Sequence, residues 1–382
     1  MSDVRNAEER VARQALRERR KKEHIEAVQT LPDQGGTGFE DLVLLPESAC
    51  EVDVDEVSLN IEFFGRPLRS PVIINAMTGG TAQAHGINRR LARFAQRHGL
   101  AMAVGSETAA LEDSAAAASY AVVRESNPEG LIIANVGMGA DVARAQRAVD
   151  LIRADVLQIH WNAAQELFMA EGDRRFRGLL QRFREVARDV TVPVIAKEVG
   201  QGMTGPVARR FVDWGARGID IGGMGGTNFI AVEAWRRGLP LDQEWLRWGV
   251  PTAASLGEVL AEVAAEVTIV ASGGIRSGHD VAKALAMGAH AVGIAGPLMR
   301  LAVAEDSDDA LDRWLEDLHA TLKMVMVLMG ARTVEELRRR PLIMTGRTRE
   351  WLELRGYLPF VEALSRRDRA RASVAGALSE KS

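Results

Sequence analysis

The sequence predicts an α/β protein built as a (β/α)8 TIM barrel, with an N-terminal helical arm and a C-terminal helical extension. The first observation behind this prediction is a regular alternation, from about residue 70, of short apolar runs with longer helical patterns. The second is that the runs are continuously apolar, as is typical of parallel strands buried on both faces. The third is that polar or glycine-rich residues follow the runs, which is where such barrels carry their chemistry.

The predicted barrel strands are eight segments, each followed by enough chain for a crossover helix. An open, doubly wound sheet would show the same alternation, but eight units of this length favour closure into a barrel. Two intervening helices, over residues 84–98 and 280–287, are each followed by a glycine that suits a helix C-terminus. The strands are expected at residues 71–76, 100–105, 131–135, 156–160, 192–197, 218–223, 268–274 and 291–296.

Three regions are expected along the 382 residues. Residues 1–38 form a basic helical arm that ends in a flexible, Gly-rich joint. Residues 39–305 form the cofactor-binding barrel, and residues 306–382 form a helical extension with a charged tail. The long gap from residue 229 to about residue 260 contains three tryptophans and predicts an inserted loop or lid as well as a helix.

The composition excludes several classes of protein. A net charge of −4 gives no general affinity for nucleic acid or an anionic membrane. The single cysteine, Cys50, excludes an internal disulfide and a cysteine metal cluster. The N-terminus has no secretory pattern, and no run approaches about 18 apolar residues, so we expect a cytoplasmic protein without a membrane span. Barrels of this size often associate, so we expect a homo-oligomer of unknown size.

The ends of the last strands predict a phosphate site. Loops after the seventh and eighth strands of such barrels often bind phosphate through backbone N–H groups, and glycines let the phosphate approach. Both loops are glycine-rich here, at residues 272–276 and 295–296, and Arg276 can add a bidentate contact. The glycine cluster at residues 222–228 extends this rim with the Thr227 hydroxyl. The alternative is that these glycines only turn the chain.

Other strand ends predict a slot for a flat ring beside that phosphate. Lys197 ends an apolar strand, where an unpaired ammonium group would be costly to bury. It therefore either pairs with Glu198 or another carboxylate, or faces a bound anion or an electron-rich heterocycle. Small and amide side chains end three further strands, and flavin mononucleotide (FMN) fits the resulting combination of phosphate, ring and cation. These residues are Asn75, Ala76, Met77, Thr78, Ser106 and Asn135.

Imidazole, amide and carboxylate side chains follow the fourth strand. Glu166 suits Mg²⁺, which prefers one or two carboxylates together with substrate phosphate oxygens. No His/Cys cluster suits zinc. His160 could instead be a hydrogen-bonded core histidine. Likewise, the basic run at residues 17–22 could be a solvated helix face.

These motifs, taken together and in order, resemble type 2 isopentenyl-diphosphate isomerase over about residues 20–340. The resemblance implies interconversion of isopentenyl and dimethylallyl diphosphate on reduced FMN with Mg²⁺, with NADPH or NADH reducing the flavin. The motifs are NAMTGG (75–80), HWNAAQE (160–166), EGDR (171–174), KEVG (197–200), GGT (225–227), SGG (272–274) and RKKEH (20–24).

The resemblance also implies roles for individual residues. Gln165, His160 and Lys197 would be catalytic, and Glu166 would bind Mg²⁺. The substrate would be bound by Arg20, Lys21, His24, Ser106, Asn162 and Gln165. FMN would contact Ala76, Met77, Thr78, Ser106, Asn135, Lys197, Thr227, Gly274, Ile275, Arg276, Ala295 and Gly296.

The expected chemistry adds a proton at one carbon and removes one from another, in a closed site that keeps water from an intermediate cation. The Gln165 carboxamide is too weak an acid and base to drive this alone. The reduced flavin is the better candidate, and Lys197 would favour its anionic form. The basic arm could close over the diphosphate. Two residues depart from the family pattern, Thr108 in place of an arginine and Trp161 in place of a smaller aliphatic residue.

Alternative functions remain open. An FMN-dependent 2-hydroxy-acid oxidase or dehydrogenase would use the same barrel, but its His-Gly-x-Arg stretch is missing. A nucleotide dehydrogenase of the inosinate type needs a loop cysteine, and Cys50 is misplaced for that role. A non-enzymatic flavin- or phosphate-binding scaffold is the third alternative. A longer prenyl diphosphate as substrate also stays open.

Overall fold

A computed structural model describes residues 19–33, 35–304 and 307–368. The expected (β/α)8 TIM barrel is confirmed, because eight parallel strands close on themselves when β11 pairs with β4. The rest of the predicted arm and charged tail lies outside the described residues. The barrel strands are β4 (Val72–Ile74), β5 (Ala101–Ala103), β6 (Ile132–Gly137), β7 (Val156–Trp161), β8 (Val194–Glu198), β9 (Gly218–Asp220), β10 (Thr268–Ser272) and β11 (Ala291–Ile294).

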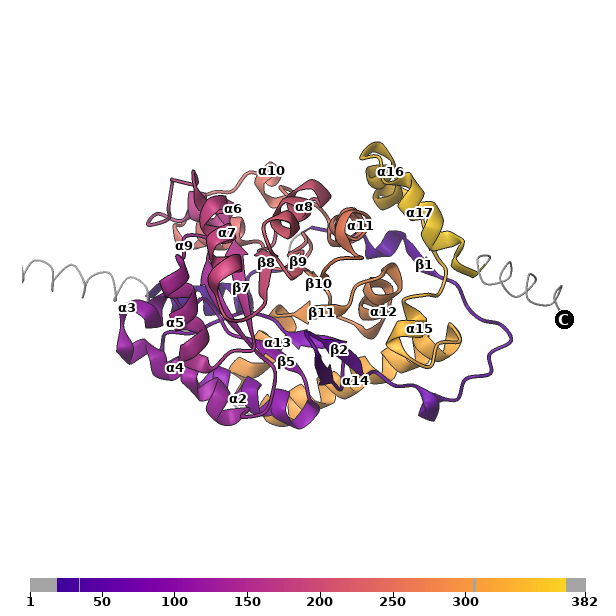
Figure 1. Cartoon of the computed structure of the whole chain (residues 1–382), viewed down its shortest axis with the longest axis horizontal. Helices are drawn as coiled ribbons and strands as arrows, with labels where there is room; N and C mark the ends of the chain where they lie inside the picture. The colour runs from indigo at the N-terminus through magenta and orange to yellow at the C-terminus, as the bar shows by residue number, and fades with distance from the viewer. Residues whose placement is uncertain (1–18, 34, 305–306, 369–382) are drawn as a thin grey trace, which may run out of the picture.

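Helices surround the barrel and bury one apolar face each against the strands (Figure 1). The predicted helix α2 (Ala82–His98) begins where the Thr81 hydroxyl accepts a hydrogen bond from the Ala84 amide. It ends at Gly99, whose φ of 63° lies in the left-handed region that glycine adopts easily. The other barrel helices are α4 (Ser114–Ser126), α5 (Val142–Ile152), α7 (Leu179–Asp189), α8 (Gly205–Asp213), α11 (Thr252–Val263), α12 (Gly278–Met287) and α13 (Gly296–Val303).

Short helices lie in the loops that follow the strands. The segment with three tryptophans contains α9 (Phe229–Arg236) and α10 (Gln243–Leu246) before α11, so the predicted insertion is helical. Two more short helices, α3 (Thr108–Glu112) and α6 (Ala163–Phe168), follow β5 and β7. Within the described residues, no helix is both long and apolar enough to cross a membrane.

A hairpin that the sequence pattern did not predict closes the other end of the barrel. Strands β2 (Ile61–Phe63) and β3 (Arg66–Leu68) pair antiparallel ahead of the first barrel strand. The side chains of Phe63 and Leu68 are buried in one cluster with residues from the barrel strands. The hairpin therefore covers the barrel interior and leaves the opposite end for chemistry.

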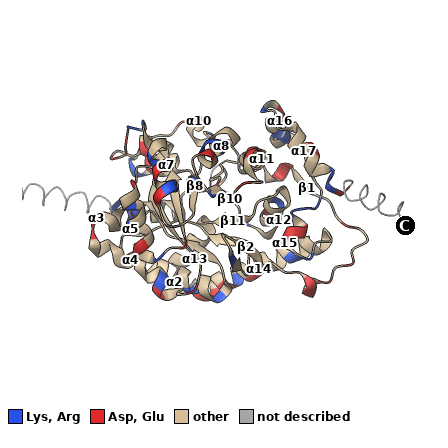
Figure 2. Cartoon of the chain, in the orientation of Figure 1, with Lys and Arg blue, Asp and Glu red and all other residues tan. Residues whose placement is uncertain are grey.

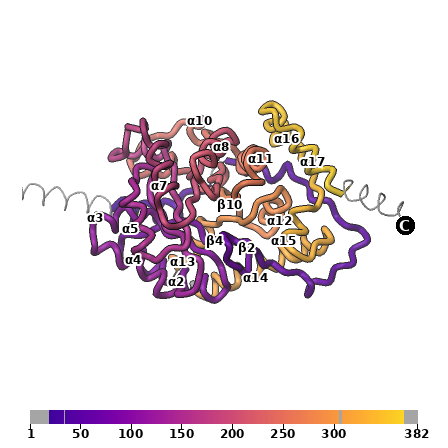
Figure 3. Tube along the Cα trace, viewed as in Figure 1, coloured from indigo at the N-terminus to yellow at the C-terminus, as the bar shows by residue number. Residues whose placement is uncertain are grey.

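The segments before and after the barrel pair with each other. Strand β1 (Leu42–Leu44) pairs antiparallel with β12 (Leu342–Met344), which joins chain ends that lie about 300 residues apart. The predicted helical extension thus also contains one short strand, β12. Between β1 and β2, the chain follows the outside of the extension (Figure 3), where the Glu47 amide donates to the Leu328 carbonyl. The extension also contains α14 (Ser307–Leu328), α15 (Val334–Leu337), α16 (Gly346–Leu354) and α17 (Leu358–Ser365).

A buried carboxylate connects this extension to the barrel helices. The Glu258 side chain on α11 is fully buried. It accepts hydrogen bonds from the Trp351 indole on α16 at 2.9 Å and from Nε of Arg355, the residue after α16, at 3.1 Å. It also accepts one from the Gly205 amide, at the start of α8, at 3.0 Å. One side chain therefore joins three helices.

We predict that Glu258→Ala lowers the free energy of unfolding by about 2–3 kcal/mol, because the buried Gly205 amide and the partly buried Trp351 indole lose their acceptor. Arg355 adds little to this loss because its side chain is 45% exposed. Urea unfolding of the variant measures the loss, with Glu353→Ala, an exposed carboxylate on α16, as the control. An equal loss in both variants would contradict the role given to Glu258.

Candidate active site

Two adjoining cavities occupy the carboxyl end of the barrel. The first, here called the inner cavity, is lined by the loops after β4, β8, β9, β10 and β11. The second, the outer cavity, lies among the loops after β4 to β8 and the helical segment 19–30. Lys197, Met77 and His24 line both cavities, so the two are continuous.

The inner cavity fits the flavin predicted from the strand ends. A Cβ on Gly274 would lie 2.3 Å from the Gly225 carbonyl oxygen, so only glycine lets these loops approach. The Thr78 hydroxyl is buried and has no hydrogen-bond partner among the described residues, which leaves it available to a ligand. The predicted flavin residues that line this cavity are Ala76, Met77, Thr78, Lys197, Thr227, Gly274, Ile275, Arg276, Ala295 and Gly296. Ser106 and Asn135 line the outer cavity instead.

Arg276 already has a carboxylate partner in the inner cavity. Its guanidinium group donates to Asp33 Oδ2, from Nε at 2.9 Å and from Nη2 at 2.7 Å. Arg300 lies 3.6 Å from the same oxygen. Asp33 belongs to the joint that follows the arm, and no local pattern in the sequence predicted this contact. A phosphate bound here would share Arg276 with Asp33 or displace it.

Lys197 is paired with a carboxylate, which was one of the two alternatives that its position left open. Its ammonium group lies 3.0 Å from Asp220 Oδ2, and both side chains are almost fully buried. The carboxylate partner is thus Asp220 on β9, while Lys197 still lines both cavities. Asp220 also accepts hydrogen bonds from Asn75 Nδ2, at 2.8 Å, and from the Ser272 hydroxyl. Sequence reasoning missed Asp220, although a lone aspartate inside an apolar strand is a signal for a buried partner.

The outer cavity brings together the residues that were assigned to substrate and metal. Arg20, Lys21 and His24 come from the helical segment 19–30 and line the cavity from one side. Burial, and then the neighbouring Arg20, lowers the pKa of Lys21 to about 8. Two adjacent cations therefore line a cavity that a diphosphate could enter. The remaining predicted members that line it are Ser106, Asn135, His160, Asn162, Gln165, Glu166 and Lys197.

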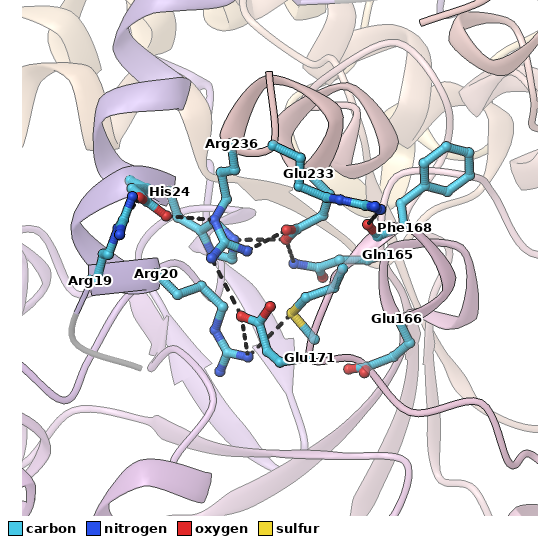
Figure 4. A network of polar contacts seen from close by, with 12 residues as sticks. Arg19, Arg20, His24, Gln165, Glu166, Phe168, Glu171, Glu233 and Arg236 are labelled. Carbon is cyan, nitrogen blue, oxygen red and sulfur yellow. Dashed lines mark hydrogen bonds and ion pairs between the residues drawn. The ribbon is translucent and has the colours of Figure 1, made fainter. Parts of the chain in front are cut away.

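A buried carboxylate that sequence reasoning missed links the arm to the barrel (Figure 4). Glu233 Oε1 lies 2.8 Å from His24 Nε2 and accepts a hydrogen bond from Gln165 Nε2 at 3.0 Å. Its other oxygen accepts from Arg236. Burial opposes ionisation of Glu233, but hydrogen bonds from His24 and Gln165 and the charge of Arg236 lower its pKa below the usual value. A glutamate inside the apolar helix α9 was the signal available in the sequence.

Arg236 extends this network toward the mouth of the cavity (Figure 4). It donates from Nε to Glu23 on the arm at 2.9 Å and lies 3.3 Å from Glu171. Arg20 lies 3.7 Å from the same Glu171 carboxylate. Ion pairs and hydrogen bonds therefore attach the arm to the barrel at three of its residues, Arg20, Glu23 and His24.

The geometry around His160 defines its protonation. Its Nδ1 lies 2.9 Å from Asn135 Oδ1, and the Asn135 amide nitrogen donates to the Val104 carbonyl. Asn135 therefore offers an acceptor, so the histidine carries its proton on Nδ1 and a lone pair on Nε2. Burial, with the charges of Lys21 and Lys197, lowers the pKa of His160 to about 3. The ring stays neutral near neutral pH.

Two hydrogen bonds hold the Glu166 carboxylate in place. Its Oε1 accepts from Asn162 Nδ2 at 3.3 Å, and its Oε2 accepts from the Asp173 amide at 2.8 Å. Across the described chain, no three His, Cys, Asp or Glu residues cluster as a complete metal site. A Mg²⁺ ion here would take one carboxylate from the protein and its other oxygens from substrate and water, which is a normal arrangement for this ion.

The two departures from the family pattern differ in their consequences. Thr108 lines the outer cavity, and its hydroxyl lies 3.1 Å from the Ser106 hydroxyl. The Trp161 ring instead packs on Phe211 and Phe183, with ring centroids 5.0 and 6.2 Å apart. The Trp161 ring therefore packs toward the surrounding helices and lines neither cavity.

Comparison with known proteins settles the family. Isopentenyl-diphosphate delta-isomerase of Geobacillus sp. (strain WCH70) is 45% identical over 342 residues, which cover 89% of this chain and 97% of the relative. The enzyme of that name from Moorella thermoacetica is 44% identical over 337 residues, which cover 88% and 96%. The chain belongs to the isopentenyl-diphosphate delta-isomerase family.

Broader comparisons agree on the cofactor and the fold of this isomerase-family chain. Residues 141–344 match the family model for FMN-dependent dehydrogenases, which supports FMN as the cofactor. A mandelate oxidase structure aligns with a TM-score of 0.59 at 22% identity, covering 82% of this chain and 94% of that one. A lactate oxidase of Pediococcus acidilactici gives 0.62 at 21%, covering 85% and 87%. Likenesses this distant show the shared barrel fold alone.

Glu107 is a further buried carboxylate of this isomerase-family chain, between Ser106 and Thr108, which line the outer cavity. Glu107 has no exposed surface. One Glu107 oxygen accepts a hydrogen bond from the backbone N–H of Asn135 at 2.9 Å, and the other oxygen has no partner among the described residues. Burial raises the pKa of Glu107 well above its usual value, and the Asn135 amide opposes this only in part. Burial therefore favours the protonated form of this side chain.

We predict that Glu107→Gln becomes increasingly favourable as pH rises. The folded protein binds the Glu107 proton more tightly than the unfolded chain, so this residue makes the native protein lose stability as pH rises above the unfolded pKa. Glutamine keeps the shape without titrating. Urea unfolding at about pH 5 and about pH 8 compares the two proteins. The variant should gain stability relative to the native protein at the higher pH, unlike the exposed control Glu125→Gln.

We also predict a strong coupling between Lys197 and Asp220. Lys197→Met or Asp220→Asn alone leaves a buried charge without its partner, which costs about 3–5 kcal/mol. The double variant removes both charges and should recover part of this loss. Urea unfolding of flavin-free protein, arranged as a double-mutant cycle, measures the coupling. If the stability losses of the two single variants simply add in the double variant, then Lys197 and Asp220 do not stabilise each other, which would contradict the prediction.

Proposed function

We propose that this chain interconverts isopentenyl diphosphate and dimethylallyl diphosphate, in isoprenoid biosynthesis, on reduced FMN with Mg²⁺. NADPH is the proposed reductant of the flavin. The observation that carries the proposal is the outer cavity, in which Arg20 and Lys21 face Glu166 and Gln165 beside Lys197. The names of the relatives, the match to FMN-dependent dehydrogenases and the fit of the inner cavity to a flavin support it.

The cations and the metal ligand hold the substrate diphosphate in this proposal. Arg20 and Lys21 would neutralise phosphate oxygens, and Mg²⁺ on Glu166 would bind others. His24 Nε2 lies 2.8 Å from Glu233 Oε1, so His24 connects the arm to the barrel in addition to its proposed contact with the substrate. Ser106 and Asn162 would add hydrogen bonds from the neighbouring strand ends.

Gln165 is held at both ends of its amide. It donates to Glu233 at 3.0 Å, and its Oε1 accepts from Asn162 at 3.0 Å. This fixes the carboxamide as an orienting group beside the reacting carbons. The apolar walls that would exclude water include Met77, Met169 and Phe229.

FMN, when bound, supplies an acid–base nitrogen and an electron-rich ring for the double-bond shift. Lys197 is the residue proposed to favour the anionic reduced ring, because its ammonium group lines the inner cavity. Asp220 holds Lys197 in that position. His160 lines the outer cavity as a neutral ring that would orient the substrate by accepting a hydrogen bond at Nε2.

The decisive experiment is anaerobic turnover with dithionite-reduced FMN, Mg²⁺ and isopentenyl diphosphate. We expect dimethylallyl diphosphate to form without net consumption of reductant. Glu166→Gln should weaken the response to Mg²⁺ by about 10–100-fold. The control Glu185→Gln, a half-buried carboxylate on α7 that lines neither cavity, should leave this response unchanged. No product from flavin-loaded protein would refute the isomerase proposal and favour an oxidoreductase.

A further inference from the structure

A third hollow, here called the arginine recess, adjoins the outer cavity on the far side of Glu166. It shares with that cavity the lining residues Thr108, Gly137, Asn162, Glu166 and Asp173, so the two adjoin. Its floor is apolar, formed by Leu111, Val136, Met138, Ala140 and Leu179. Its other lining residues are Gly139 and the four arginines Arg144, Arg175, Arg177 and Arg182.

The charges of the recess favour an anion. Arg175 and Arg177 have no ion pair or side-chain hydrogen bond within the part of the chain that the structure describes. Arg144 lies 3.5 Å from Glu112, and Arg182 donates to the Gly139 carbonyl at 3.1 Å.

The lining therefore holds four guanidinium groups against the two carboxylates Glu166 and Asp173. Both carboxylates already accept backbone or side-chain hydrogen bonds on their own side of the recess. Figure 2 shows basic positions on and beside α5 and α7, the helices that carry Arg144 and Arg182.

The isomerisation proposed above makes no use of these arginines. The diphosphate of its substrate is placed on Arg20 and Lys21, which line the outer cavity but not the recess. A ligand of the recess must combine phosphate groups with a body that lies on an apolar floor. Because the recess opens into the outer cavity beside Thr108, such a ligand could also extend toward Lys197 and the inner cavity.

We infer that the arginine recess binds the phosphate-bearing adenosine half of NADPH, while the nicotinamide ring reaches the flavin through the outer cavity. This inference rests on the proposed function, and it assigns the reductant its site. Guanidinium groups bind phosphate through paired N–H donors, so four of them favour the additional 2′-phosphate of NADPH over NADH.

The redox step is balanced. The dihydronicotinamide ring transfers a hydride, carrying two electrons and one proton, and becomes the oxidised nicotinamide, while FMN becomes the two-electron-reduced flavin. Since the nicotinamide ring and the diphosphate substrate would both occupy the outer cavity, they bind alternately. Isopentenyl diphosphate should therefore compete with NADPH.

Anaerobic stopped-flow reduction of the FMN-loaded protein tests the inference. Bleaching of the flavin absorbance is followed at increasing NADPH, and separately at increasing NADH. The double variant Arg175→Ala/Arg177→Ala should weaken the apparent Kd for NADPH by about tenfold or more, with a smaller change for NADH. Arg182→Ala should do the same to a lesser extent. Arg184→Ala is the matched control, because it removes an exposed arginine from the same helix outside the recess.

A second measurement separates this inference from the proposed function. Isomerisation is assayed in the same variants after reduction by dithionite, which needs no nucleotide site. An unchanged KM for isopentenyl diphosphate, together with the weaker NADPH binding, would support the inference. A raised KM for the substrate would instead show that the recess binds the substrate diphosphate. That outcome, or an NADPH Kd within about twofold of the native protein, would overturn the inference.

Discussion

The arrangement of the outer cavity depends on one buried carboxylate, Glu233. An ionised carboxylate without exposed surface is costly unless it is paired and hydrogen-bonded. Glu233 meets this condition through His24 on the arm, Gln165 on α6 and Arg236 on its own helix. These partners come from three separate parts of the chain, so satisfying one charge brings together the arm and the loop after β7.

Glu233 also begins a line of hydrogen bonds that runs through the cavity. The Asn162 amide donates hydrogen bonds to Gln165 and to Glu166. The backbone amide of Asp173 donates to the other oxygen of Glu166. The orientation of the Gln165 amide is therefore coupled to the carboxylate proposed to bind Mg²⁺. Docking of the arm, which supplies Arg20 and Lys21, depends on the same network. The residues proposed to bind the diphosphate and the amide proposed to orient the substrate therefore belong to one hydrogen-bonded unit.

The inner cavity uses the same principle with opposite charge. A buried ammonium group, Lys197, is stabilised by Asp220 on the next strand, and Asn75 and Ser272 also donate to that carboxylate. Because Lys197 lines both cavities, it stands where a flavin and a substrate would meet. The glycine loops after β9 and β10 can approach each other only because they lack side chains. The inner cavity therefore combines the buried Lys197–Asp220 pair with glycine loops that leave room for the proposed flavin.

The sequence by itself determined the barrel and the order of its strand ends. Continuous apolar runs mark strands buried on both faces, and parallel strands in a closed barrel place all their carboxyl ends on one rim. Residues such as Lys197, His160 and Glu166 could therefore be assigned to one site from their position after a strand alone.

Only the tertiary structure decided which side chains meet. The pairing of β1 with β12, the hairpin under the barrel and the contact of Arg276 with Asp33 join segments that no local pattern relates. Asp220 and Glu233 lie within apolar segments, where a lone acid shows that a partner is needed but not which one. The physical reason is that hydrophobic periodicity is a local property, whereas the pairing of a buried charge depends on long-range packing.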